Sequence, residues 1–182
     1  MIDEIGKGTI EIINQAKSGT HICLFFKSKE DLTDILVPYF KSGLESNEFC
    51  IWIIAEPLSV EEAKELLKKN IENFDRYIRK KQIEILDAHE WLAQLGKFNS
   101  ERVLEQWLKK EKQALRKGFN KLRLAGNSLW LGEVDWKDFS EYESLANRII
   151  DHNRIIALCS YPLDKLQTPQ VTDAIGNHEF AL

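Results

Sequence analysis

The sequence is poor in cysteine and proline, and it has no long uninterrupted apolar stretch. Its three cysteines, Cys23, Cys50 and Cys159, are odd in number and far apart, which excludes a disulfide framework and is typical of a reduced compartment. No segment approaches the ~18 consecutive apolar residues of a membrane-spanning helix, and the charged, amphipathic N-terminus is unlike a signal sequence. We therefore expect a cytoplasmic protein that does not engage a membrane.

An excess of positive charge is also missing. The chain of 182 residues has 25 basic and 29 acidic residues, a net charge of −4, and the basic residues are scattered among the acidic ones. Proteins that bind a phosphate backbone gather lysine and arginine on one face. The composition therefore predicts no direct nucleic-acid binding.

Glycine is absent where a nucleotide-binding protein needs it. The stretch SGTHICLFFKSKEDL, residues 18–32, reads as a buried strand followed by a loop and a helix. A phosphate loop, G-x-x-x-x-G-K-[ST], supplies backbone N–H donors, a lysine and a hydroxyl for magnesium, whereas here Lys27 and Ser28 stand alone. The sequence also has no G-x-S-x-G elbow and no H-E-x-x-H motif. We therefore predict a non-enzymatic protein without a cofactor.

Short apolar runs alternate with segments of helical periodicity along the whole chain. The runs predict five strands, at residues 21–26, 49–55, 82–88, 121–131 and 155–161. The intervening periodicity predicts helices at residues 2–17, 30–45, 59–81, 100–118 and 138–152. This alternation is typical of an α/β fold, a three-layer sandwich with a mainly parallel central sheet of about five strands. The length fits one domain, residues 1–182.

Histidine, cysteine and aromatic side chains are paired along the predicted strands. Side chains two positions apart share one face of a strand, which pairs His21 with Cys23, Cys50 with Trp52, and Cys159 with Tyr161. One reading is a single small cavity with polarizable walls, where His21 or Tyr161 bonds an alcohol or amine. A second is a metal site with His21 and Cys23, although no C-x-x-C or H-x-x-x-H pairing supports it. The third is plain core packing.

Other candidates lie near the ends of the predicted strands, where parallel sheets bind ligands. A guanidinium inside an apolar strand needs a partner, so Arg123 pairs with Asp87 or Glu56, or else contacts a ligand anion. Trp130 is one of several tryptophans near predicted strand ends, and these side chains either line an apolar pocket or pack in the core.

Several segments in order resemble one family of sensory domains. The segments are GTHICLFF, GLESNEFCIW, LRLAGNSLW, FSEYESLANRII, ALCSYPLD and NHEFAL, and together they span most of the chain. They resemble the MEDS family, the methanogen/methylotroph DcmR sensory domain. His178 in NHEFAL matches a recurring family feature, whereas Asn127 and Ser128 stand where the family's glutamate is expected. The resemblance implies sensing of a small hydrophobic or weakly polar molecule, a simple hydrocarbon derivative of the C1 type. It also implies relay to histidine kinase or transcription-regulator modules in cis or in trans, with a homodimer left open.

A more distant resemblance is to ATPases of the RecA/KaiC type. The segment FKSGLESNEFCIWIIAEPLS is similar to their second strand, and Glu56 would take the place of a catalytic glutamate. This resemblance implies a degenerate RecA-like fold that has lost the phosphate loop. Two alternatives to the sensory function therefore stay open. One is a divergent nucleotide-binding domain that uses Lys27 and Glu56, and the other is a thiol or metal sensor that uses His21 and Cys23.

Overall fold

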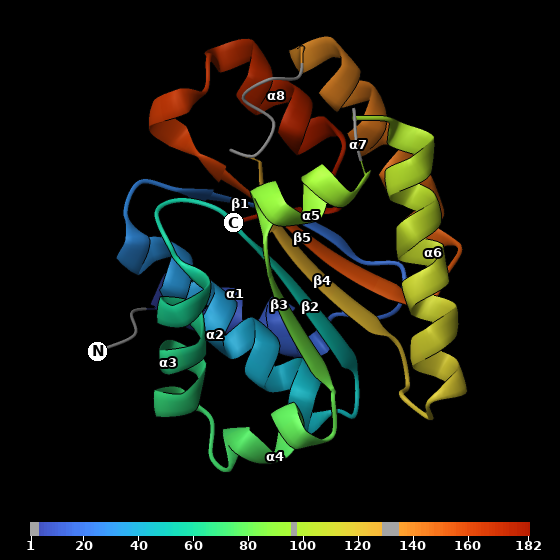
Figure 1. Cartoon of the computed structure of the whole chain (residues 1–182). Coiled ribbons are helices and arrows are strands. Elements are labelled where there is room, and N and C mark those ends of the chain that lie inside the picture. The colour runs from blue at the N-terminus through green and yellow to red at the C-terminus, as the bar shows by residue number, and fades with distance from the viewer. Residues whose placement is uncertain (1–3, 96–97, 129–134) are drawn as a thin grey trace.

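The computed structural model describes residues 4–95, 98–128 and 135–182 (Figure 1). Along the chain, the elements are α1 (Glu4–Gln15), β1 (His21–Phe26), α2 (Lys29–Glu45), β2 (Phe49–Ile54), α3 (Val60–Asn70), α4 (Phe74–Arg79), β3 (Ile83–Asp87), α5 (Ala88–Leu95), α6 (Ser100–Arg116), β4 (Leu122–Asn127), α7 (Trp136–Asp151), β5 (Ile155–Pro162), the 3₁₀ turn η2 (Leu163–Lys165), α8 (Thr168–Gly176) and β6 (Phe180–Ala181). None of the helices in these ranges is both long and apolar enough to cross a membrane.

Within the described ranges, the strands form one six-stranded sheet in the order β3-β2-β4-β5-β1-β6, and every neighbouring pair is parallel. The α/β class and the parallel sheet are therefore confirmed. The predicted count of about five strands missed β6, which has only two residues and pairs with β1 at the sheet edge. A strand this short leaves no alternating apolar pattern to recognise.

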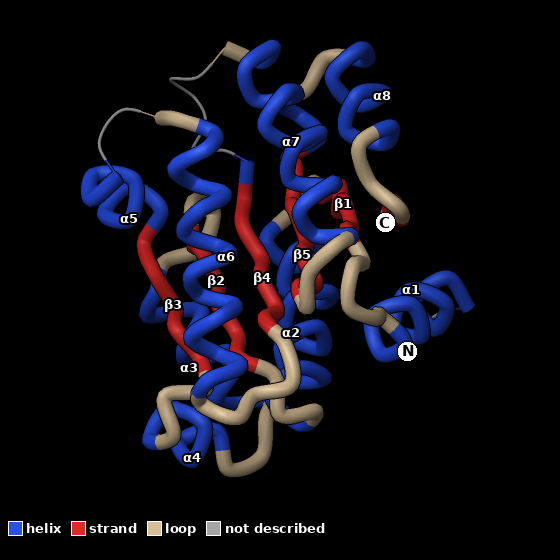
Figure 2. Tube along the Cα trace, turned by 90° about the vertical axis from the view of Figure 1, so that its right-hand side faces the viewer, coloured by secondary structure: helices blue, strands red, loops and turns tan. Residues whose placement is uncertain are grey.

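Helices cover both faces of the sheet, and each face has its own apolar core (Figure 2). On one face, buried residues of α2 and α3 pack with Cys50 and Trp52 of β2. On the other face, buried residues of α6 and α7 pack with Ile51 and Ile53 of the same strand. This split follows from the period of a strand, because successive side chains point to opposite faces.

The predicted helices differ from the structure in several places. The segment 59–81 divides into α3 and α4, and Asn73 between them has a φ of 55°. Helix α5 begins directly after β3 and was not predicted. Helix α2 continues through Pro38, although proline lacks the N–H that a helix interior normally uses.

Candidate functional site

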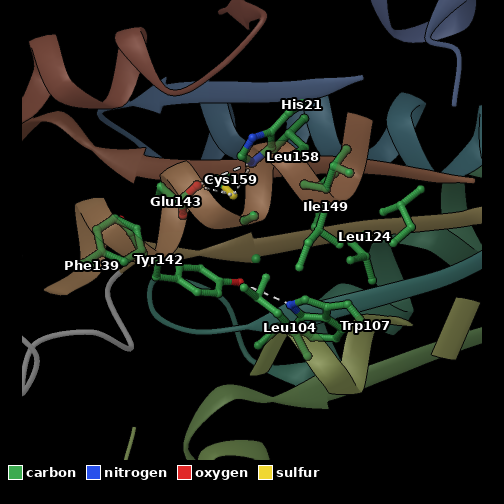
Figure 3. Close-up of a pocket in the computed structure, with 18 of the residues that line it drawn as sticks. His21, Leu104, Trp107, Leu124, Phe139, Tyr142, Glu143, Ile149, Leu158 and Cys159 are labelled. Carbon is green, nitrogen blue, oxygen red and sulfur yellow. Dashed lines mark hydrogen bonds and ion pairs between the residues drawn. The ribbon is translucent and has the colours of Figure 1, made fainter. Parts of the chain in front are cut away.

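An apolar cavity lies between the sheet and helices α5, α6 and α7 (Figure 3). The strand residues along it include Leu124, Gly126 and Ala157, which lie in the middle of β4 and β5. The cavity has about 60 Å³ of free volume. One enclosed water needs roughly 10–15 Å³ of such free volume, so the cavity accepts a molecule of a few heavy atoms.

Aromatic side chains form the wall of the cavity that faces away from β1. Trp107 and Trp91 stack with ring centroids 4.9 Å apart. The Trp107 indole Nε1 donates a hydrogen bond of 3.2 Å to the Tyr142 hydroxyl. This bond satisfies the indole donor, so the wall presents mainly carbon to the cavity. The wall combines the consecutive helices α5 and α6 with α7, which follows β4.

The opposite end of the cavity is polar. His21 begins β1, Cys159 lies on the adjacent strand β5, and Glu143 reaches toward both from α7 (Figure 3). His21 Nε2 lies 3.4 Å from Glu143 Oε2 and 3.5 Å from Cys159 Sγ. The Cys159 thiol donates to Glu143 Oε2 at 3.7 Å. Three groups that can bind a proton or a metal thus meet at one end of an otherwise apolar space.

His178 completes this group from the segment after α8. Its Nε2 atom lies 3.4 Å from Glu143 Oε2, and its ring centroid lies 3.9 Å from that of His21. The side chains of His21 and His178 are 1% and 0% exposed, so both are shielded from bulk water. We refer to His21, Glu143, Cys159 and His178 as the polar cluster.

Burial controls the protonation of the polar cluster. It raises the pKa of Glu143 to about 8, against the opposing influence of hydrogen bonding with Cys159 and Tyr161. It lowers the pKa of His178 to about 4. Burial, and then the charge of His178, also lowers the pKa of His21, although hydrogen bonding to Asn147 and to the Asn177 backbone opposes the shift. Near neutral pH the cluster therefore holds neutral imidazoles beside a largely protonated carboxyl group.

The structure brings several of the predicted site residues together. His21, Cys159 and His178 belong to the polar cluster, and Tyr161 packs close to it, with its ring centroid 5.9 Å from that of His178. Cys23 pairs with Cys159 in the sheet register and lies on the same face, but it does not join the cluster. Burial raises the pKa of the Cys23 thiol to about 12.

The expectation of one cavity for all the candidates is wrong for Cys50 and Trp52. Both side chains belong to the core on the α2 and α3 face, with the sheet between them and the polar cluster. Trp52 stacks on Phe40 of α2 with ring centroids 4.9 Å apart. The sequence showed that Cys50 and Trp52 share a face, but not which face.

The predicted partners of Arg123 are also wrong. Its Nε donates to Glu48 Oε2 at 2.5 Å, rather than to Asp87 or Glu56. The guanidinium also lies over the Tyr39 ring, 4.6 Å from the centroid. Arg123 is only 1% exposed, and its side chain packs against Gly43 and Tyr39 of α2, on the face of the sheet opposite the cavity. Its contacts are those of a core residue.

The remaining predicted candidates lie elsewhere. Glu56 is exposed and lines, with Lys27 and Lys165, a separate groove at the carboxyl ends of β1, β2 and β5. The Asp31 carboxylate accepts hydrogen bonds from the backbone N–H groups of Lys27 and Ser28 at the start of α2, where a phosphate loop would hold its anion. Trp130 lies outside the described residues.

Sequence reasoning missed Glu143, Asn147 and Trp107. Glu143 and Asn147 are one helical turn apart, on the face of α7 whose apolar positions pack against the sheet. The Asn147 side chain contacts His21, with its Oδ1 3.3 Å from His21 Nδ1. Polar residues at positions that periodicity assigns to the core were the available signal, because burying them requires partners.

Known proteins resemble this chain in sequence and in fold. Residues 20–179 match the family MEDS, the MEthanogen/methylotroph, DcmR Sensory domain. The transcriptional repressor DcmR of Methylorubrum extorquens (strain DSM 6343 / CIP 106787 / DM4) is 26% identical over 162 residues, which are 87% of this chain. The match spans 58% of the length of that curated relative.

Two solved structures share the fold at low sequence identity. The flagellar accessory protein FlaH from Methanocaldococcus jannaschii has a TM-score of 0.65 at 13% identity, over 99% of this chain and 77% of that one. A KaiC-like protein from Pyrococcus horikoshii OT3 has a TM-score of 0.63 at 15% identity, over 90% and 70%. The fold is therefore RecA-like. Since the family match covers most of the sequence, the chain belongs to the MEDS family of sensory domains.

Proposed function

We propose that this domain senses a small, weakly polar molecule that binds in the cavity beneath α6 and α7. The observation that carries the proposal is the buried contact between an apolar space and the polar cluster. A sensory role fits the family and its relative, a transcriptional repressor. Unlike the candidate sites at the strand ends, the cavity combines enclosure with a few convergent polar groups, which is typical of small-molecule sites.

The cavity limits the chemistry of the ligand. Its free volume of about 60 Å³ suits a molecule of a few heavy atoms. The aromatic wall favours an apolar body such as that of a halomethane, and Glu143 or His21 can form one hydrogen bond with a hydroxyl or amine. We therefore propose a simple hydrocarbon derivative of the C1 type, such as a short alcohol, a methylamine or a halomethane.

The C-terminal segment offers a physical route for the signal. It carries His178 and lies along the edge of β1 that faces away from β5, where β6 pairs with β1. Backbone hydrogen bonds attach this segment to β1, including those donated by Glu179 N–H to His21 O at 2.8 Å and by Leu182 N–H to Cys23 O at 2.9 Å. A ligand that moves His178 would favour one arrangement of this segment over another, which is the requirement for signalling. The receiver would be a histidine kinase or transcription-regulator module in cis or in trans.

A nucleotide-binding function is a weaker proposal. The groove with Lys27 and Glu56 lies where a RecA-like fold would bind phosphate. However, the N–H groups of Lys27 and Ser28 already bond to the Asp31 carboxylate, whose negative charge would repel a phosphate. We accordingly propose a domain without ATPase activity.

Thermal denaturation with a ligand panel tests the proposed function. Short alcohols, methylamines and halomethanes should raise the melting temperature in a saturable manner, whereas ATP with magnesium should not. The substitution Ala157→Val adds two methyl groups at the cavity wall and should abolish the response. As a control, Ile54→Val costs about 0.5–1.5 kcal/mol in the opposite core and should leave the response intact. Stabilisation by ATP alone would overturn the proposal.

A further inference from the structure

The polar cluster has the composition and spacing of a metal site. From its geometry, we infer that His21, Glu143, Cys159 and His178 together bind one divalent transition-metal ion of the zinc class. These residues offer two imidazole nitrogens, one carboxylate oxygen and one sulfur, all within 4.8 Å of one another. The inference goes beyond the proposed function, because metal binding at the cluster needs no organic ligand.

The hydrogen bonding of His178 leaves a lone pair aimed into the cluster. Its Nδ1 atom lies 2.6 Å from the carbonyl oxygen of Ala174. A carbonyl only accepts, so Nδ1 carries the proton and the neutral ring has its lone pair on Nε2. Nε2 is buried and has no hydrogen-bond partner in the described structure. An unpaired acceptor in a buried site is costly, and a metal ion would satisfy it.

His21 is oriented in the same way. Its Nδ1 atom faces the Oδ1 atom of Asn147 at 3.3 Å, which leaves Nε2 directed at Glu143 and Cys159. Metal-binding histidines typically donate their other ring N–H to a carbonyl or carboxylate, which fixes the ring and its tautomer. The contacts of His178 with Ala174 and of His21 with Asn147 follow this pattern.

The distances within the cluster suit a tetrahedral ion better than direct hydrogen bonds. Both nitrogen-to-oxygen distances to Glu143 are 3.4 Å, which is long for hydrogen bonding. With zinc bonds of about 2.0–2.2 Å to nitrogen and oxygen and about 2.3 Å to sulfur, tetrahedral ligands lie about 3.4 Å apart, or about 3.6 Å where sulfur is involved. The cysteine sulfur lies 3.5 Å from His21 and 3.7 Å from Glu143.

The donor types also indicate the class of metal. Magnesium and calcium prefer sites made only of oxygen, whereas imidazole and thiolate favour zinc and similar ions. Among the described residues, the basic side chains within 4 Å of the Glu143 carboxyl group are His21 and His178, with no lysine or arginine. A bound cation would therefore favour the ionised form of Glu143, which has no lysine or arginine beside it among the described residues. From the sequence, His21 and Cys23 were the candidate metal ligands, whereas in the structure the cysteine beside His21 in the cluster is Cys159.

Cobalt substitution tests this site directly. Chelator-treated protein titrated with Co²⁺ should bind one equivalent, with intense visible absorption of tetrahedral cobalt and a thiolate-to-cobalt band. Zn²⁺ should then displace the cobalt. The substitution Cys159→Ala should remove the thiolate band, and His178→Gln should weaken Co²⁺ binding by more than the roughly 10–100-fold that follows loss of a supporting hydrogen-bond partner. Asn147→Ala, which removes only the support of His21, should weaken binding by about 10–100-fold.

Matched controls separate the cluster from nonspecific binding. Cys50→Ala removes a buried cysteine on the other face, and His152→Ala removes an exposed histidine, so both should leave the cobalt spectrum and affinity unchanged. Circular dichroism of each variant checks that it folds. Octahedral cobalt spectra, or a thiolate band that survives in Cys159→Ala, would overturn the inference. If stabilisation by alcohols persists in protein that binds no metal, the metal site is refuted and the sensory function stands.

Discussion

Arg123 provides a quantitative test of the assignment of residues to core or site. The substitution Arg123→Met keeps an unbranched side chain in β4 but removes the guanidinium. The Glu48 carboxylate, which is 3% exposed, then loses its Arg123 partner. Lys121 then remains as a partner at 3.4 Å. Removing one member of a buried pair costs about 3–5 kcal/mol. Since Lys121 compensates part of the charge, we expect a loss near the lower end, about 3 kcal/mol.

A double-mutant cycle with Glu48→Gln measures this loss. Urea unfolding followed by circular dichroism at fixed pH and salt gives the free energy of unfolding for each variant. A loss of about 3 kcal/mol corresponds to a drop in melting temperature of about 6–12 °C for a domain of this size. The double variant should recover at least half of the loss, because no unpaired charge remains. The ligand response should be unchanged in all variants.

Two results would refute this reasoning. A loss below about 1 kcal/mol in Arg123→Met would mean that Glu48 is not left buried and uncompensated. A double variant as unstable as the sum of the single variants would mean that the two side chains do not interact. Loss of the ligand response in a folded Arg123→Met protein would instead show that Arg123 takes part in ligand binding.

Three further predictions concern single positions. Asp31→Asn should lower the free energy of unfolding at neutral pH but not in acid. Backbone hydrogen bonds lower the folded-state pKa of Asp31, so the stability that its carboxylate contributes is lost as pH falls through that pKa. Urea unfolding across pH 2–7 measures this, and a difference between variant and parent that does not change with pH would contradict it. Gly43→Ala places a Cβ 2.6 Å from Arg123 Cδ and should cost about 1–3 kcal/mol, whereas Gly8→Ala, with no atom of the described residues within 4 Å of its Cβ, should not destabilise; equal melting temperatures would contradict this. Among described atoms, the Cβ added by Gly126→Ala meets only Ile53 Cβ, at 3.8 Å, so it should preserve the melting temperature yet reduce stabilisation by halomethanes, and an undiminished response would exclude Gly126 from the site.

Local pattern was enough to predict the layers of the fold. The buried strands are continuous apolar runs, so β1, β2 and β5 could be located from composition alone. The strand order β3-β2-β4-β5-β1-β6 could not be predicted in this way, because it depends on which strands pair across long connections. That order decides that Cys159 lies beside β1, and that Arg123 lies next to Cys50.

The candidate site was less accessible to sequence reasoning for the same reason. His21, Cys159 and His178 were each recognised as chemically capable, but their meeting point requires β1, β5 and the segment after α8 to be neighbours. Glu143 lies on a helix whose apolar positions drew attention to packing instead. Glu48 was overlooked as the partner of Arg123 because it precedes β2 rather than following a strand.

The central claim is that the cavity beneath α6 and α7, bounded by the polar cluster, is where this domain binds its ligand. Methyl NMR of the intact chain during titration with methanol, methylamine and a halomethane tests it most directly. The claim predicts saturable shifts at methyl groups of cavity residues such as Ile53, Leu124 and Ala157, with those of Leu36 and Ile54 on the opposite face unchanged. Saturable shifts confined to Leu58, beside the groove with Lys27 and Glu56, would contradict it.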